Sequence, residues 1–397
     1  MSRERPFRTL SFAVAVRHRP HRGVKRRLIS TAEPTIPFHV PDRVVDIDGF
    51  LADARAILES GRLSLGPYVE RLEAAVVPWV GPGQVAAVSN CSDGLIAAVW
   101  SIRDPGAEVI VPGFTYLATW QAVIWAGMTP VVADVDERGL LDPAAVEAAV
   151  GPRTRAILGV HLAGHPADLA GLRAIADRHG LALLFDSAHA FGARWVDGPV
   201  GSGGDVEVFS IGPTKQLGVN EGGLVVANDP SIAQRIRRFA TQGHQLGQLD
   251  ALEMGMNLRM PELSAALALR ALPQLDERLA ARAALHERYR TAWCDLPLTV
   301  PGPRDGERSA HKDSLVFVDD AALRDPLREH LAAVGVATKP YYDPAIPDLT
   351  AFTGRVASAE RSRDLATRSF AVPIHGRMAQ GDVERVTAAL RSFPAWS

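Results

Sequence analysis

Short apolar runs alternate with amphipathic segments along the chain from about residue 46 onward. The apolar runs predict strands at residues 84–88, 107–111, 129–134, 155–162, 181–185, 206–211 and 223–227. Because these runs are mainly apolar and do not alternate strictly between apolar and polar residues, they are typical of strands buried on both faces of a sheet. Together with the helices expected between them, they predict an α/β fold built on a mostly parallel sheet.

The segments between and after these runs have helical spacing. Helices are expected at residues 48–58, 92–102, 115–127 and 168–179, after the Asp142–Pro143 start signal, and as one long helix at 262–289. Beyond them, a strand at 314–318 and helices near 321–334 and 380–392 indicate a smaller α+β part. We therefore expect a large domain at 62–295, a small domain at 296–397, and an N-terminal segment at 28–61 that packs on the small domain.

Charge is distributed unevenly. The 397 residues carry 43 Lys+Arg against 45 Asp+Glu, but residues 1–27 hold nine of the basic residues and a single acid. That stretch is expected to be a disordered basic tail, or alternatively an arm that binds an anionic partner. The near-neutral body argues against nucleic-acid binding.

Two further features bear on the compartment. The chain has no apolar run near the ~20 residues of a membrane span. Its two cysteines, Cys91 and Cys294, cannot form a disulfide framework. A cytoplasmic protein with no membrane partner is expected.

The candidate functional residues lie at the ends of predicted strands, which is where ligands bind in open α/β sheets. Residues 89–94 lie between a predicted strand and helix, so their N–H groups suit a phosphate, or else form an ordinary capped turn. Asp186 ends the apolar run at 181–185 and either caps the next turn or pairs with a cation.

Lys215 follows Ser210 and the run at 206–211, and it is one of only four lysines, with Lys25, Lys312 and Lys339. Arginine stays protonated, whereas lysine can become neutral and form an imine. We expect no other lysine near the strand ends. A phosphate cradle, a carboxylate and a lysine together fit pyridoxal 5′-phosphate.

Aromatic residues at a further strand end suit the flat ring of that cofactor. Phe114 or Tyr116 could stack on one ring face, although aromatic residues at such turns are more often part of the core.

Several motifs in order resemble one enzyme family. They are Asn-Cys-Ser-Asp-Gly-Leu at 90–95, Val-Pro-Gly-Phe-Thr-Tyr at 111–116, Phe-Asp-Ser-Ala-His-Ala at 185–190, Phe-Ser-Ile-Gly-Pro-Thr-Lys at 209–215, Glu-Gly-Gly at 221–223 and Gly-Met-Asn-Leu-Arg-Met at 255–260. From about Leu63 to the C-terminus the chain resembles the DegT/DnrJ/EryC1/StrS aminotransferases, fold-type-I enzymes of amino sugar and aminocyclitol biosynthesis.

The resemblance implies a role for each matching residue. Lys215 bonds to the cofactor and moves protons, Asp186 pairs with the ring nitrogen, and His189 lies beside the ring hydroxyl. The phosphate is expected to be bound by Ser92, Ser210, the Cys91 backbone and, from the neighbouring subunit of a homodimer, Asn257. The ring is expected to lie between Tyr116 and Ala188.

The implied activity is transfer of an amino group from glutamate or glutamine to a nucleotide-linked keto sugar or a keto-cyclitol. A dehydratase or eliminase of the same family, or a non-catalytic regulatory protein on this fold, are the alternatives. Known family dehydratases carry histidine where this chain has Lys215.

Some positions depart from the family or suggest other chemistry. Cys91 stands where the family usually has glycine, and Asn220 is also in place of a glycine, where it is expected to preserve a left-handed turn. His161 and His165 are four residues apart but straddle a strand end, so no metal site is expected.

Overall fold

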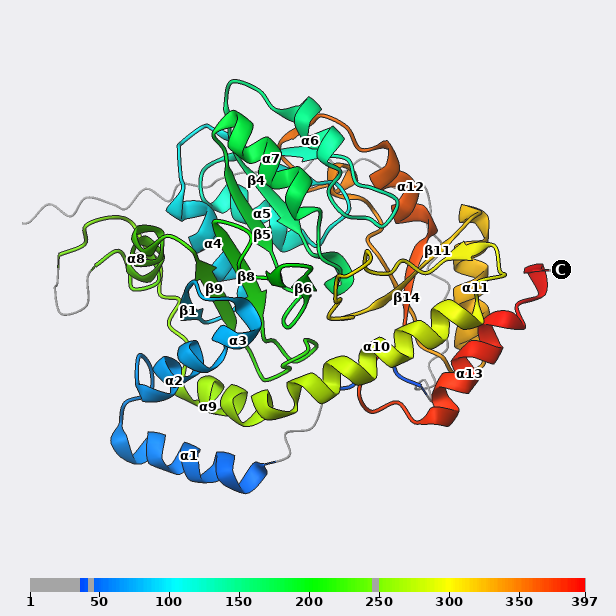
Figure 1. Ribbon diagram of the computed structural model, residues 1–397, viewed down its shortest axis with the longest axis horizontal. Coiled ribbons are helices and arrows are strands. Elements are labelled where there is room, and N and C mark those ends of the chain that lie inside the picture. The colour runs from blue at the N-terminus through cyan, green and yellow to red at the C-terminus, as the bar shows by residue number, and fades with distance from the viewer. Residues whose placement is uncertain (1–35, 42–45, 245–249, 397) are drawn as a thin grey trace, which may run out of the picture.

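The computed structural model describes residues 36–41, 46–244 and 250–396 (Figure 1). The basic segment at 1–27 lies outside the described residues. The central element is an eight-stranded sheet covered by helices on both faces, so the predicted α/β fold is confirmed (Figure 1). None of the helices in the described ranges is both long and apolar enough to span a membrane.

The strand order in the large sheet is β1-β9-β8-β5-β4-β2-β3-β13. The bounds are β1 Gln84–Val88, β2 Glu108–Pro112, β3 Thr129–Ala133, β4 Thr154–Val160, β5 Ala182–Asp186, β8 Val206–Ser210, β9 Gly223–Ala227 and β13 Arg355–Val356. Only β9 runs against its neighbours, pairing antiparallel with β1 and β8, and the other pairs are parallel. All seven predicted strands are present, each within two residues of its predicted ends.

Helices link the strands and pack two apolar cores against the two faces of the sheet. They are α2 Pro67–Ala75, α3 Val77–Val80, α4 Cys91–Ser101, α5 Leu117–Trp125, α6 Pro143–Ala149, α7 Leu169–His179 and α8 Pro230–Phe239. Side-chain caps start four of them, with Asn90, Asp142, Asp168 and Asp229 accepting from backbone N–H groups two or three residues ahead. A short hairpin, β6 Arg194–Trp195 with β7 Gly198–Pro199, lies outside the large sheet.

The prediction of a single helix at 262–289 is wrong, because the helix is interrupted. The structure has α9 Glu262–Ala271, a 3₁₀ turn at Leu272–Gln274, and then α10 Leu275–Ala292. The break coincides with Pro273, which has no N–H to donate and whose ring crowds the preceding turn. Helix α10 then runs from the large sheet to the C-terminal part (Figure 1).

The C-terminal part contains a four-stranded sheet in the order β10-β11-β14-β12. Its elements are β10 Leu298–Thr299, β11 Ser314–Val318, α11 Ala321–Ala333, β12 Lys339–Pro340, α12 Glu360–Arg368, β14 Ser369–Val372 and α13 Gln380–Arg391. The predicted strand at 314–318 and the helices near 321–334 and 380–392 are confirmed. We keep 62–295 and 296–397 as the proposed domains, although β13 returns to the large sheet beside β3.

The N-terminal segment expected to pack on the small domain divides into two parts. Ile36 forms a bridge with Val336 and is buried in the core of the small sheet. Helix α1 (Ile47–Ser60) instead lies along α9 of the large domain (Figure 1). Two ion pairs hold it there, from Arg270 to Asp46 at 2.6 Å and to Asp53 at 2.7 Å.

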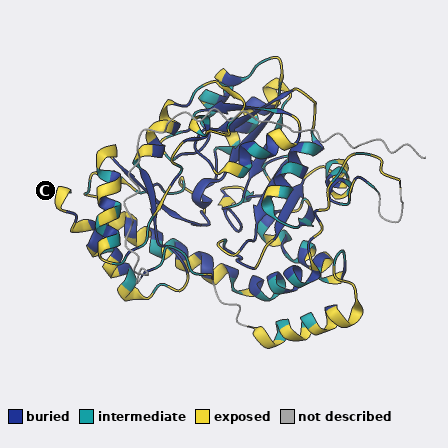
Figure 2. Cartoon of the chain, turned by 180° about the vertical axis from the view of Figure 1, so that it is seen from behind, coloured by how far each residue is buried: buried dark blue, intermediate teal, exposed yellow. Residues whose placement is uncertain are grey.

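Burial follows this architecture closely. Most strands of the two sheets are buried, whereas the short edge strands β12 and β13, the outer faces of the helices and much of α1 are exposed (Figure 2). A cavity lies at the carboxyl ends of the parallel strands, where residues of the C-terminal part such as Lys312, Lys339 and Tyr341 also line it.

Candidate active site

A cavity of about 330 Å³ lies at the carboxyl ends of β5 and β8, a volume within the usual range for small-molecule sites. Eight of the nine predicted site residues line it: Cys91, Ser92, Tyr116, Asp186, Ala188, His189, Ser210 and Lys215. The ninth, Asn257, does not line it.

Asp186 is a buried carboxylate at the end of β5, with 4% of its surface exposed. Its Oδ2 accepts a hydrogen bond from Thr119 Oγ1 at 2.8 Å, and its Oδ1 accepts from the Ala188 N–H at 3.1 Å. Burial raises the pKa of Asp186, although these two hydrogen bonds act to lower it. Buried carboxylates are normally paired, so this one is suited to a cationic group of a ligand in the cavity.

Lys215 lies in the turn after β8, where its side chain lines the same cavity. Burial, together with the positive charge of Lys312, lowers the pKa of Lys215 to about 8. A substantial fraction of this amine is therefore neutral near neutral pH, as a nucleophilic lysine requires.

His189 is held as one tautomer. The Ala163 N–H donates to its Nδ1 at 3.2 Å, so the proton of the neutral ring is on Nε2. Burial and the nearby charge of Lys215 keep its pKa well below the usual value. The ring is therefore neutral and can donate a hydrogen bond from Nε2 into the cavity that it lines.

The N-terminus of α4 forms the anion-binding side of the cavity. Its cap is Asn90, so Cys91 and Ser92 are the first two helical residues, and their N–H groups have no partner within the helix. Helix α4 begins at Cys91, and the predicted turn at 89–94 is therefore largely the first helical turn. The Cys91 thiol lies 3.9 Å from the Val208 carbonyl of β8, so this side chain packs against the sheet instead of blocking the N–H groups.

The two aromatic candidates separate. Phe114 is fully buried in the core and packs edge-on against Phe317 and Tyr342. Tyr116 lines the cavity, with its ring centroid 6.3 Å from that of Tyr342. Tyr116, and not Phe114, is thus available to a bound ring.

The expectation that no other lysine lies near the strand ends is wrong. Lys312 and Lys339 line the same cavity as Lys215. Lys312 Nζ lies 2.9 and 3.0 Å from the two carboxylate oxygens of Asp313, which also accepts from the Tyr341 hydroxyl. The rarity of lysine is the signal that could have found them, because three of the four lysines converge here.

Two residues singled out from the sequence, Asn257 and Asn220, do not line the cavity. Asn257 is exposed, and its Oδ1 accepts from Arg259 Nε at 2.8 Å. Asn220 is exposed and is not among the non-glycine residues with positive φ in the described part of the chain. The expected left-handed turn at Asn220 is therefore wrong.

Comparison with known proteins places this geometry in a family. Residues 46–391 match the model of the DegT/DnrJ/EryC1/StrS aminotransferase family, and the chain belongs to that family. It is 37% identical over 346 residues to dTDP-3-amino-3,4,6-trideoxy-alpha-D-glucose transaminase of Streptomyces venezuelae, covering 85% of this chain and 90% of the relative. It is 39% identical over 350 residues to the erythromycin biosynthesis sensory transduction protein EryC1 of Saccharopolyspora erythraea, covering 85% and 93%.

Solved structures agree with this assignment. DesV of S. venezuelae, determined in complex with a ketimine intermediate, superposes with a TM-score of 0.84 at 34% identity, covering 91% of this chain and 98% of DesV. DesI, determined in the presence of its TDP-sugar product, also gives a TM-score of 0.84, at 35% identity and with 91% and 93% coverage. The fold is that of the fold-type-I aminotransferases.

Proposed function

We propose that this protein is a pyridoxal-phosphate aminotransferase that converts a nucleotide-linked keto sugar, or a keto-cyclitol, to the amino compound. The amino donor is glutamate or glutamine. The observation that carries the proposal is the pairing, in one cavity, of a lysine whose pKa is lowered to about 8 with the buried carboxylate of Asp186.

The residues of the cavity fit this cofactor. The N–H groups at the start of α4, with the Ser92 and Ser210 hydroxyls, suit its phosphate. Asp186 suits the protonated ring nitrogen, since the buried carboxylate lacks a cation in direct contact among the residues described. Tyr116 and Ala188 would lie against the two ring faces.

The catalytic work then falls to a few side chains. When bound, the cofactor supplies an electron sink for the charge that develops at the α-carbon of the donor. Lys215 Nζ, when neutral, would take the proton from that carbon and deliver it to C4′ of the cofactor. In the second half-reaction it would move a proton from C4′ to the former carbonyl carbon of the acceptor. Asp186 would hold the proton on the ring nitrogen, and His189 Nε2–H would donate to the oxygen on the ring.

Lysines suit the anionic parts of the two substrates. Lys339 is exposed at the cavity, 5.2 Å from the centroid of the Tyr341 ring. Its ammonium group can bind a donor carboxylate or the diphosphate of a nucleotide-linked sugar. The relatives named above that act on dTDP- or TDP-linked sugars support the second of these.

The alternatives are a dehydratase or eliminase and a cofactor-binding sensor. Lys215 weighs against the first, because it retains the amine needed for amino transfer. The name of the EryC1 relative refers to sensory transduction. However, Lys215, with its lowered pKa, lines the same cavity as the Asp186 carboxylate, and this pair favours turnover over binding alone.

The proposal is tested by a panel of dTDP-linked keto sugars and keto-cyclitols with glutamate or glutamine. We expect one acceptor to gain an amino group, detected as a mass change, with the matching keto acid formed in equal amount. Loss of water from the sugar without amino transfer would support the dehydratase. A cofactor absorbance that no donor changes would support the sensor.

We further propose a homodimer with shared active sites. Asn257 is exposed and outside its own chain's cavity, and the preceding residues expose Leu252, Met254 and Met256 at 54, 75 and 43%. Exposed apolar side chains of this size suit a protein interface. The partner's cavity would then receive Asn257 beside the phosphate.

Mixing two inactive variants tests this arrangement. Lys215→Ala and Asn257→Ala chains, each impaired alone, form one intact site when they combine, because one chain supplies the lysine and the other the asparagine. Half of randomly mixed dimers are hybrids with one good site of two, so about a quarter of wild-type activity is expected to return. If both residues serve the same chain's site, mixing restores nothing.

A further inference from the structure

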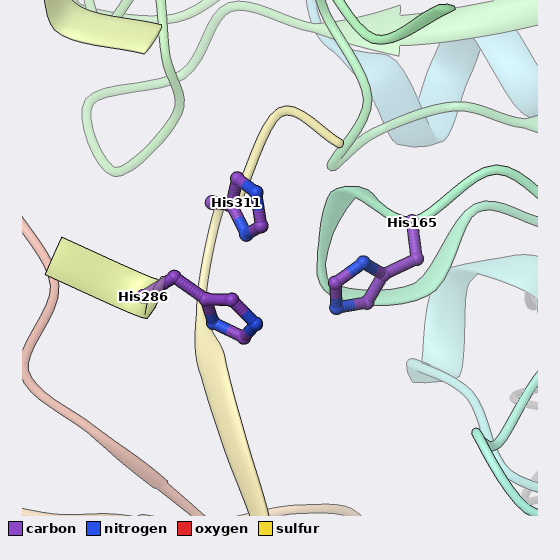
Figure 3. A group of neighbouring side chains, drawn as sticks. All are labelled: His165, His286 and His311. Carbon is purple, nitrogen blue, oxygen red and sulfur yellow. The ribbon is translucent and has the colours of Figure 1, made fainter. Parts of the chain in front are cut away.

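Three buried histidines from distant parts of the chain face one common space (Figure 3). His165 follows the 3₁₀ turn η1 (Leu162–Gly164) after β4, His286 is on α10, and His311 lies in the segment before β11. Each offers one ring nitrogen, and these nitrogens all lie within 4.8 Å of one another. His161, four residues before His165, is not part of the cluster: its ring stacks on Phe185 and faces Glu207.

The backbone is arranged to bring two of these rings together. The Ala310 N–H donates to the Gly164 carbonyl at 3.0 Å, and the Lys312 N–H donates to the Ala163 carbonyl at 2.8 Å. His311, between them, has a φ of +41°, which side-chain-bearing residues rarely adopt. Such strain persists where surrounding contacts enforce it and is common at functional sites.

The rings leave ring nitrogens without partners in a buried place. Among the described residues, both nitrogens of His165 and Nδ1 of His311 have no hydrogen bond. A buried polar atom without a partner is costly. A neutral imidazole offers one nitrogen lone pair, which a metal ion can take up.

The geometry fits a metal ion. A zinc ion bound tetrahedrally at about 2.1 Å from each nitrogen would hold the ring centroids about 5.2 Å apart. The three centroid separations are 4.4, 5.6 and 5.7 Å, on both sides of that value. His286 Nδ1 lies 3.0 Å from Ser314 Oγ, which is the kind of outer hydrogen bond that orients a histidine ligand through its other nitrogen.

The donor atoms, not the surrounding charges, narrow the class of metal. Arg138, Arg282 and Arg290 are near the rings, and their charge opposes every cation alike. The cluster offers imidazole nitrogens alone and no carboxylate. Calcium and magnesium, which need oxygen ligands, are therefore disfavoured. Neutral imidazoles suit zinc and the other late first-row metals.

We propose that His165, His286 and His311 form a binding site for a late first-row transition-metal cation such as zinc, with a fourth position for water. The metal fastens the loop after β4, helix α10 and the segment before β11 to one another. This junction lies directly behind the cavity, since Ala163 hydrogen-bonds His189 and Lys312 follows His311. The site rests on none of the residues assigned to amino transfer.

The test uses the full chain without an affinity tag, stripped of metal by a chelator and returned to zinc. Wild-type protein is expected to retain one zinc per chain after gel filtration and to melt at a higher temperature with zinc than without. His286→Gln is expected to lower zinc affinity at least ~100-fold, measured by competition with a chromophoric chelator. His179→Gln, which removes a histidine of α7 that contacts Glu147, is the matched control and should bind zinc as wild type does.

A second measurement does not depend on the folding of any variant. Cobalt added to the stripped wild-type protein should give the intense visible bands of tetrahedral coordination, and zinc should displace them. Failure of the wild type to take up stoichiometric zinc, or equal zinc affinity in His286→Gln and wild type, overturns the proposal. Stabilisation by chloride or sulfate in place of zinc would also overturn it and identify an anion site.

Discussion

Replacing Lys215 with alanine is expected to slow amino transfer by about 10³-fold or more, which corresponds to about 4 kcal/mol of lost transition-state stabilisation. Lys215 is the lysine whose pKa is lowered to about 8, so its amine is the one suited to accept the α-carbon proton. The side chain is half-buried at the cavity and forms no ion pair among the described residues. The variant should therefore fold normally.

Two other lysines in the cavity make the control important. Lys312 Nζ donates to both carboxylate oxygens of Asp313, and this pairing directs it away from the cofactor. Lys339 is exposed at the cavity. Borohydride reduction of the cofactor-loaded wild type, followed by peptide mapping, should therefore find the cofactor on Lys215 alone. In the Lys339→Ala variant the cofactor should still be found on Lys215.

The outcomes separate the roles of the three lysines. Cofactor mapped to Lys312 or Lys339 in the wild type would show that the assignment of Lys215 is mistaken. Turnover by Lys215→Ala within tenfold of wild type would contradict its role in proton transfer even if the cofactor were attached there.

The parts of the fold that depend on local pattern were predictable from the sequence. The buried strands are mainly apolar runs rich in Val, Ile, Leu and Ala, and that pattern favours a sheet covered on both faces. Caps such as Asp142 and Asp168 mark helix starts because they act within two or three residues. The break at Pro273 was predictable by the same local reasoning and was missed because the Ala- and Leu-rich pattern continues across it.

The site was predictable only as far as strand ends define it. Asp186, Ser210 and Lys215 end or follow neighbouring strands, so the topology of the sheet brings them together. Lys312 and Asp313 come from the start of the small sheet, and their arrival at the cavity depends on how two distant segments pack. The cluster of His165, His286 and His311 could not be predicted for the same reason, because its members come from three separate parts of the chain and have no common spacing.

Asp186→Asn should slow the half-reaction with the amino donor by about 10²-fold, or about 2.7 kcal/mol, while cofactor is still bound. The amide can keep one hydrogen bond, from Thr119 or from the Ala188 N–H, but it carries no negative charge to hold a proton on the ring nitrogen. The rate is read by following the cofactor absorbance after rapid mixing with donor. Cofactor affinity, measured separately, should change far less than the rate.

The sequence also allowed Asp186 to be a simple cap, and the chain contains a matched residue that is one. Asp134 follows β3 and accepts hydrogen bonds from the N–H groups of Arg361 and Ser362 and from the Ser362 hydroxyl, away from the cavity lining. Asp134→Asn should therefore lower the melting temperature, because its hydrogen bonds are worth about 1–3 kcal/mol of stability in total. It should leave the half-reaction rate within about threefold, because Asp134 does not line the cavity. Asp186→Asn should instead slow the half-reaction and change the melting temperature less. If both variants lose stability and neither loses rate, Asp186 is also a cap, and the charge that holds the ring proton must come from another residue.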